Sequence, residues 1–189
     1  MQSSMSNRRK ETQLFSTQNL VKMALCIAFC CVSAFISFPL PLTPGLVTAL
    51  TIALTVTALV LPPQLAFLTV AAYVLLGAIG LPIYPGGIGG LGRLFGPTGG
   101  FYIGWPFVCF IESLCKGQQV SFRRYALVAV CLGVPLTYVG GLISMMHVQQ
   151  VGLYEGLVMA ALPFIPGDIM KALLASLIAV RVNRVLARR

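Results

Sequence analysis

Long apolar runs with almost no charged residues make up most of this chain, and they restrict its fold more than any other feature. Charged residues amount to 9% of the sequence, whereas hydrophobic residues reach 58%. A soluble domain carries about a quarter charged residues, so this chain cannot cover a water-facing surface. We therefore predict an all-α membrane protein that lies in the bilayer over nearly its whole length.

Six transmembrane helices are expected, because 189 residues suit about six crossings of roughly 20 apolar residues each. Proline, glycine or polar segments separate the runs. Helix-breaking prolines between positions 39 and 44 end the first run, and the most polar outer loop is expected at 147–155. The expected crossings are 17–38, 46–61, 64–79, 101–115, 125–146 and 163–180.

Basic residues gather at the ends of the apolar runs, as expected for residues that set membrane orientation. With the N-terminus inside, three basic clusters lie in the cytoplasm, and the outer loops contain a single cation, Arg93. We therefore expect a multi-pass protein of the cell membrane with both termini cytoplasmic. The clusters are Arg8, Arg9 and Lys10; Lys116, Arg123 and Arg124; and Arg181, Arg184, Arg188 and Arg189.

Asp168 and Lys171 form the strongest candidate site, within the run Pro-Phe-Ile-Pro-Gly-Asp-Ile-Met-Lys-Ala. They are three residues apart and would share one helix face. Each charge costs about 2.5–3.5 kcal/mol near the middle of a spanning helix. A fixed acceptor beside a fixed donor suits a neutral polar group such as a cyclic urea or amide. The alternative is a capping aspartate with a purely structural salt bridge.

The segment 80–100 is rich in glycine and proline yet apolar. Irregular backbone at membrane depth is tolerated only where protein buries it or where it lines a cavity. We therefore predict a re-entrant loop between the third and fourth helices that covers a pocket. Arg93 within it would bind a carboxylate; the alternative is an interfacial arginine that contacts lipid phosphate.

Other chemistry has little support in the sequence. Ala24 and Ala28 are small residues four apart, which lets helices approach closely, either within the chain or against a partner. The six cysteines form no Cys-x-x-Cys pair, and His147 is isolated, so no metal site is expected. Without a paired carboxylate or a nucleophile–base set, we predict neither an enzyme nor a cofactor.

The loop and the charged pair resemble the BioY family, the biotin-specific substrate-binding (S) components of energy-coupling factor (ECF) transporters. The most specific matches are Gly-Leu-Pro-Ile-Tyr from position 80, Gly-Pro-Thr-Gly-Gly-Phe-Tyr-Ile-Gly from position 96, and Pro-Phe-Ile-Pro-Gly-Asp from position 163. The hydropathy is similar over essentially the whole chain. The resemblance implies six helices and a substrate pocket near the outer face.

By this resemblance, Asp168 would accept hydrogen bonds from the ureido N–H groups of biotin, and Lys171 would donate to the ureido oxygen. Arg93 would bind the valerate carboxylate. Near Gly86, many relatives carry a polar side chain, whereas this chain has Pro-Gly-Gly-Ile-Gly-Gly, so a contact there would come from the backbone. The side chains expected against the bicyclic ring are Tyr84, Phe101 and Tyr138.

The family also implies partners, because this chain has no ATPase motif. A membrane coupling subunit would meet Ala24 and Ala28, and two ATP-binding subunits would supply energy for biotin uptake. We expect a cytoplasmic tail at 1–16, a transmembrane substrate-binding domain at 17–182 and a basic cytoplasmic tail at 183–189. A stand-alone secondary transporter for another small solute and a purely structural membrane protein remain the alternatives.

Overall fold

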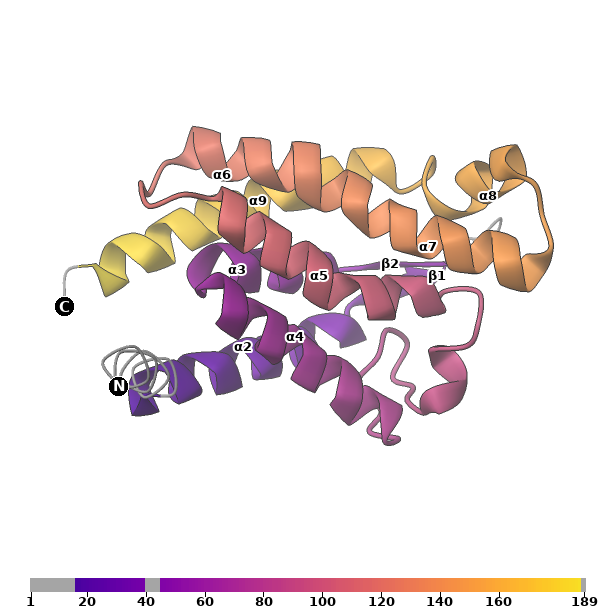
Figure 1. The fold of residues 1–189 in the computed structure, drawn as a ribbon, viewed down its shortest axis with the longest axis horizontal. Coiled ribbons are helices and arrows are strands. Elements are labelled where there is room, and N and C mark those ends of the chain that lie inside the picture. The colour runs from indigo at the N-terminus through magenta and orange to yellow at the C-terminus, as the bar shows by residue number, and fades with distance from the viewer. Residues whose placement is uncertain (1–15, 40–44, 188–189) are drawn as a thin grey trace, which may run out of the picture.

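The computed structural model describes residues 16–39 and 45–187, which form a bundle of helices. The predicted basic positions Arg8, Arg9, Lys10, Arg188 and Arg189 and the segment 40–44 lie outside these described residues. Figure 1 shows the beginning of α2 and the end of α9 at the same end of the bundle. The elements are α2 (Thr17–Phe35), β1 (Ser37–Pro39), β2 (Leu46–Thr48), α3 (Leu50–Val60), α4 (Pro63–Ala78), η1 (Leu91–Arg93), α5 (Gly99–Cys115), α6 (Phe122–Val128), η2 (Ala129–Gly133), α7 (Val134–Gln149), α8 (Leu153–Ala160) and α9 (Ile165–Leu186).

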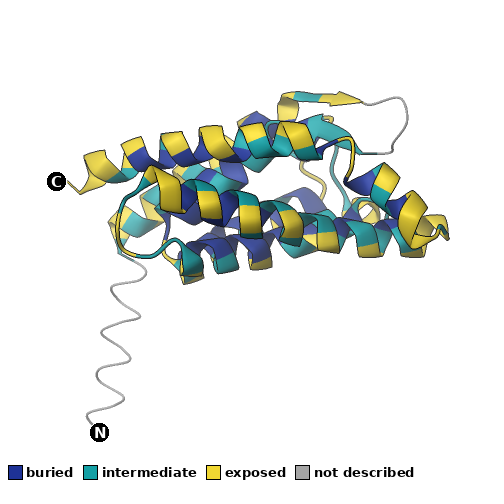
Figure 2. Ribbon diagram, turned by 90° about the horizontal axis from the view of Figure 1, so that it is seen from above, coloured by how far each residue is buried: buried dark blue, intermediate teal, exposed yellow. Residues whose placement is uncertain are grey.

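The apolar runs form helices where the sequence predicted them, with bounds set by local chemistry. Ser16 precedes α2, and its side chain accepts a hydrogen bond from the Asn19 amide, as N-cap serines do. Pro63 begins α4, where its fixed φ suits the first helical turn and its missing N–H costs nothing. Figure 2 shows the buried residues along the inner sides of the helices.

A short antiparallel ribbon replaces the predicted start of the second crossing. Leu46–Thr48 pairs with Ser37–Pro39, and α3 begins only at Leu50, so the prediction of a helix from residue 46 was wrong. The hydroxyl of Thr48 accepts from the Leu50 amide at 3.1 Å and satisfies one free donor at the helix start. The ribbon leaves the Thr48 carbonyl available to a side chain from another helix.

The fifth apolar run is longer than predicted. α6, η2 and α7 form one 28-residue helical stretch from Phe122 to Gln149, and α8 begins at Leu153. The polar loop expected at 147–155 is therefore mostly helical. Within the stretch, η2 is a π-helical turn, and Gly133 packs against Glu112, since an added Cβ would lie 1.5 Å from Glu112 Oε1.

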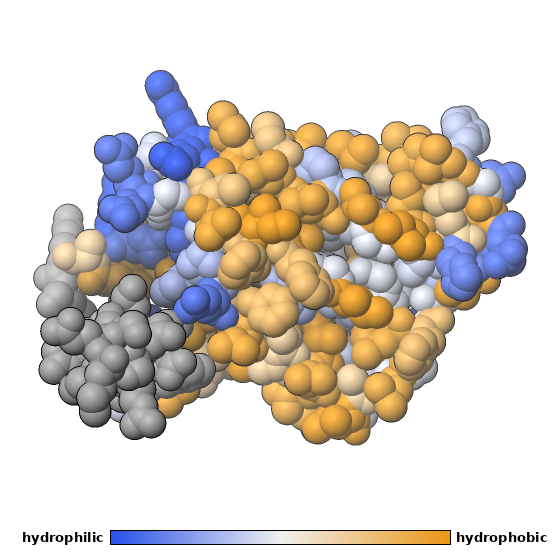
Figure 3. Space-filling view, viewed as in Figure 1, coloured by the Kyte–Doolittle hydropathy of each residue, from blue (hydrophilic) through white to orange (hydrophobic). Residues whose placement is uncertain are grey.

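The surface of the bundle is apolar over much of its length. Figure 3 shows hydrophobic side chains across the middle of the face in view and hydrophilic ones toward its two ends. Two helical stretches of the described residues, α2 and Phe122–Gln149, are long and apolar enough to cross a membrane. α8 and α9 together would make a third, bent by 49°, and α3, α4 and α5 are shorter apolar helices.

The segment between α4 and α5 is irregular, as predicted, and it is fixed against α4. It forms only η1 and an isolated bridge between Tyr84 and Ile88. The Tyr73 hydroxyl donates to the Ile83 carbonyl at 2.8 Å, and the Tyr84 hydroxyl donates to the Val74 carbonyl at 2.5 Å. Gly77 of α4 makes room for the Tyr84 ring, which an added Cβ would approach to 2.1 Å.

Two glycines bring α5 and α7 into close contact. A Cβ added to Gly100 would lie 2.0 Å from the Gly140 carbonyl oxygen, and one added to Gly140 would lie 2.6 Å from that of Gly100. Small residues permit this approach between apolar helices. The contact fixes the position of Phe101, which follows Gly100 on α5, and of Tyr138, which lies two residues before Gly140 on α7.

We expect Gly100→Ala to destabilise the protein by about 1–3 kcal/mol, because the methyl group forces α5 and α7 apart. Thermal unfolding in detergent would show a lower melting temperature. Gly92→Ala is the matched control, since an added Cβ there meets no atom within 4 Å. Equal melting temperatures for the two variants would contradict this account of the packing.

Candidate binding site

A hollow is bordered by the ribbon, η1, α3, α5, α7, α8 and α9. The ribbon, η1 and α8 lie toward the end of the bundle away from the start of α2 and the end of α9 (Figure 1). The hollow holds about 750 Å³ of empty space, a figure that includes its open mouth. Aromatic and aliphatic side chains form most of its wall, with a few polar groups at the two ends. Such a lining suits a ligand that is apolar in the middle and polar at both ends.

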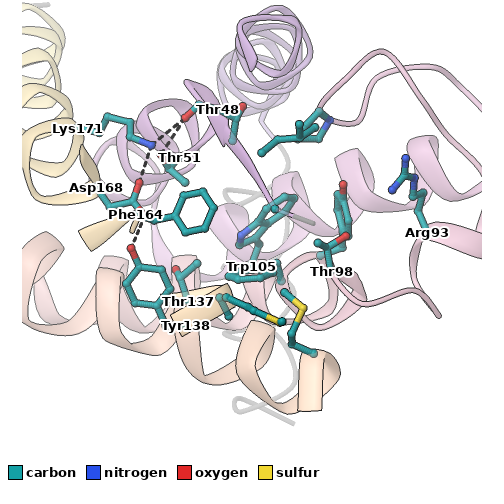
Figure 4. Close-up of a pocket in the computed structure, with 18 residues that line it drawn as sticks. Thr48, Thr51, Arg93, Thr98, Trp105, Thr137, Tyr138, Phe164, Asp168 and Lys171 are labelled. Atoms are coloured by element: carbon teal, nitrogen blue, oxygen red, sulfur yellow. Dashed lines mark hydrogen bonds and ion pairs between the residues drawn. The ribbon is translucent and has the colours of Figure 1, made fainter. Parts of the chain in front are cut away.

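Asp168 and Lys171 meet at one end of this hollow (Figure 4). Lys171 Nζ lies 2.5 Å from Asp168 Oδ1, and the two side chains are 17% and 13% exposed, respectively. Asp168 is in the first turn of α9, where the positive end of the helix favours a carboxylate. The predicted pair is therefore formed and largely buried.

Two further contacts hold the pair in place. The Tyr138 hydroxyl donates to Asp168 Oδ2 at 2.5 Å, and Lys171 Nζ donates to the Thr48 carbonyl at 3.1 Å. An ammonium group has three N–H donors, so one donor of Lys171 stays available to a ligand. The carboxylate oxygens, which accept more than one hydrogen bond each, likewise keep free acceptor capacity.

The opposite end of the hollow carries a cation. Arg93, the last residue of η1, lines it together with Thr98, which precedes α5. Within 16–39 and 45–187, the sole recorded ion pair is that of Asp168 and Lys171, so Arg93 has no carboxylate partner there. A guanidinium in this position can bind an anionic group of a ligand in a bidentate manner.

Aromatic side chains of α5 line the hollow between its ends. The residues that border it are Phe101, Tyr102 and Trp105. The rings of Tyr102 and Trp105 lie edge-to-face, with their centroids 4.7 Å apart. Tyr84 lies behind them, and its ring centroid is 4.4 Å from that of Tyr102. This stack connects the irregular segment to the pocket wall.

The structure brings most of the predicted ligand residues together, but not all. Asp168, Lys171, Arg93, Phe101 and Tyr138 line the hollow. Two others, Tyr84 and Gly86, are not among the residues that line it. Tyr84 is fully buried and supports Tyr102 from behind. The Gly86 amide donates to the Ser37 hydroxyl at 3.0 Å, while the neighbouring Pro85 reaches the pocket wall.

Several wall residues were not found from the sequence. The Thr48 carbonyl meets Lys171 only because Thr48 lies in the ribbon. The proline-rich sequence near the ribbon did not lead us to predict strands there. Trp105, the single tryptophan of the chain, resembled any apolar residue of a spanning helix. Thr51, Thr137, Met145 and Phe164 also line the hollow, and their residue types carry no signal that separates them from core positions.

Ala24 and Ala28 lie apart from the hollow, on an exposed face of α2. Neither residue is buried by another part of the chain that the structure describes. Leu25, Val32 and Phe35 are also largely exposed on this helix. Packing among the described residues therefore does not explain why Ala24 and Ala28 are small.

An apolar helical bundle with a ligand-sized hollow, a charged pair at one end and a free cation at the other defines a small-solute-binding membrane protein. The chain belongs to the BioY family, whose sequence profile matches residues 5–188. The biotin transporter BioY of Thermotoga maritima is 31% identical over 91% of this chain and 99% of that protein. The biotin transporter BioY2 of Lactococcus lactis is 31% identical over 94% of this chain and 95% of that protein.

A solved structure has the same fold. The crystal structure of the S-component for biotin from an ECF-type ABC transporter matches with a TM-score of 0.80 and 27% sequence identity. The match covers 88% of this chain and 91% of that one. The fold described above is therefore that of a transporter component located in a membrane.

We expect Lys171→Met to lower the free energy of unfolding by about 3 kcal/mol, because it leaves Asp168 buried without its cation. The double variant Asp168→Asn/Lys171→Met should recover most of this loss, since neither charge remains. Thermal unfolding of both variants in detergent measures the difference. A double variant no more stable than the single one would show that the pair is not electrostatically coupled.

Proposed function

We propose that this chain is a high-affinity biotin-binding membrane subunit that serves biotin uptake and is energised by ATP-hydrolysing partner subunits. The observation that carries the proposal is the Asp168–Lys171 pair at one end of a ligand-sized hollow in a member of the BioY family. The names of the relatives, which are biotin transporters, agree with it.

In the proposed complex, the ureido group of biotin lies against the charged pair. Asp168 accepts from the ureido N–H groups, and the remaining donor of Lys171 binds the ureido oxygen. Tyr138, which already orients Asp168, packs against the bicyclic ring together with Phe101. Charged partners strengthen such hydrogen bonds in a site that excludes water.

The valerate chain extends toward the other end of the hollow, where Arg93 binds its carboxylate. The free guanidinium and the adjacent Thr98 support this assignment. Tyr84 acts indirectly by supporting Tyr102, and Gly86 acts by holding the loop to Ser37. The segment 80–98 then serves as a re-entrant loop that covers the bound vitamin.

We further infer six membrane crossings: α2, α3, α4, α5, the stretch from α6 to α7, and the bent pair of α8 and α9. The shared end of α2 and α9 in Figure 1 and the basic clusters support cytoplasmic termini. The tails at 1–16 and 183–189 would then flank a transmembrane domain at 17–182. The hollow would face the outside, where biotin arrives.

The exposed face of α2 is the proposed contact with the ECF membrane coupling subunit. Ala24 and Ala28 would let a partner helix approach closely, and the apolar residues around them would be covered on assembly. ATP-binding subunits would act through that coupling subunit, because this chain has no nucleotide-binding motif of its own.

Asp168→Asn and Lys171→Ala should each weaken biotin binding roughly 10- to 100-fold, because each removes a charge-assisted hydrogen bond. Isothermal titration calorimetry of purified protein measures the change. Glu155→Gln is the matched control, since Glu155 is an exposed acid outside the hollow. Unchanged affinity in both site variants would refute the site.

Gradient-driven flux of another solute in liposomes that contain this chain alone, without biotin binding, would favour a stand-alone transporter.

Arg93→Gln should weaken biotin roughly tenfold or more while leaving biotin methyl ester nearly unaffected, because the ester has no anionic group to lose. Competition binding with the two ligands measures the ratio directly. If both ligands weakened equally, Arg93 would act on the loop rather than on the carboxylate.

A further inference from the structure

Trp105 presents a hydrogen-bond donor that no residue in the described part of the chain uses. Its side chain is 5% exposed and lines the hollow. Its indole nitrogen Nε1 is fully buried and has no hydrogen-bond partner among the described residues. Buried donors are rarely left unpaired, because the lost hydration is not replaced, so this group points to a partner that is absent from the protein itself.

The surroundings of Trp105 explain why no side chain fills this role. The indole is held edge-to-face against Tyr102. Figure 4 shows its nitrogen directed toward the side of the hollow where Phe164 and Thr137 lie. Phe164 offers no acceptor. The hydroxyl of Thr137 donates to the Gly133 carbonyl at 2.8 Å and that of Tyr138 donates to Asp168, and neither is within hydrogen-bonding reach of the indole nitrogen.

The position of Trp105 along the hollow narrows the identity of the missing acceptor. Figure 4 places Trp105 between the Asp168–Lys171 end and the end formed by Thr98 and Arg93. Biotin bound as proposed above has its ureido group at the first end and its carboxylate at the second. The one heteroatom of biotin between these two groups is the thioether sulfur of its ring.

We propose that the Nε1–H of Trp105 donates a hydrogen bond to the ring sulfur of biotin and thereby selects ligands that carry an acceptor atom at this ring position. This inference rests on the proposed function. Sulfur is a weak hydrogen-bond acceptor, so selectivity arises mainly from the lower affinity of ligands that offer no acceptor to the indole N–H. A ligand with methylene or methyl groups in that place leaves the buried indole donor unpaired and loses affinity, as in other sites that recognise one polar group of a substrate.

Three ligands with the same ureido and carboxylate groups test the inference. Biotin carries the ring sulfur, oxybiotin carries oxygen there, and dethiobiotin carries no heteroatom. Wild-type protein should bind biotin and oxybiotin more tightly than dethiobiotin. Trp105→Phe should strengthen dethiobiotin binding roughly 2- to 10-fold, because no donor is then left unpaired, and should change the affinities for biotin and oxybiotin by less. The wild-type preference for biotin and oxybiotin over dethiobiotin should therefore be lost in this variant.

Tyr73→Phe is the matched control, because it removes a polar group from a buried aromatic residue that does not line the hollow. It loses the hydrogen bond to Ile83 and should lower the melting temperature while the ratio of biotin to dethiobiotin affinities stays at the wild-type value. A Trp105→Phe protein that keeps the wild-type ratio would overturn the inference.

The wild-type protein provides a second test that needs no variant. Because the chain has one tryptophan, ultraviolet resonance Raman bands of the indole report on Trp105 alone. The band that responds to N–H hydrogen bonding should shift with biotin and oxybiotin and stay unshifted with dethiobiotin. An unshifted band with bound biotin overturns the sulfur contact alone. Failure of the wild-type protein to bind biotin overturns the proposed function, and the inference with it.

Discussion

The ion pair of Asp168 and Lys171 is the constraint on which the rest of this structure depends. Two charges in an apolar bundle are costly unless they are paired and hydrogen-bonded. Here Tyr138 and the Thr48 carbonyl complete the arrangement. These partners come from α7 and from the ribbon before α3, so one electrostatic requirement ties two separate parts of the chain to α9.

The opposite wall depends on aromatic packing rather than charge. Tyr73 and Tyr84 bind the irregular segment to α4 through hydroxyl-to-carbonyl hydrogen bonds, and the rings continue through Tyr102 to Trp105. The segment can therefore stay irregular without exposing much unpaired backbone. The pocket therefore has one polar end formed by the ion pair and one end formed by the loop that carries Arg93.

Most of the helices and part of the site could be predicted from the sequence. Hydropathy located the apolar runs, since the requirement for an apolar surface acts on each segment separately. The charged pair was found because charges are so rare in this composition. The residue type of Tyr84 suggested a ligand contact, whereas the position of its ring depends on Gly77, which leaves space for it in the core.

The sequence by itself determined that the chain is a membrane bundle and that Asp168 and Lys171 share a helix face. It also predicted an irregular segment at 80–100, whose last two residues in fact begin α5. These properties follow from local composition and from helical spacing. Only the tertiary structure decided that Thr48 meets Lys171, that Tyr138 orients Asp168 and that Trp105 has a donor without a partner. Each of these depends on contacts between residues far apart in the chain, and their geometry is set by how the helices and the ribbon pack together.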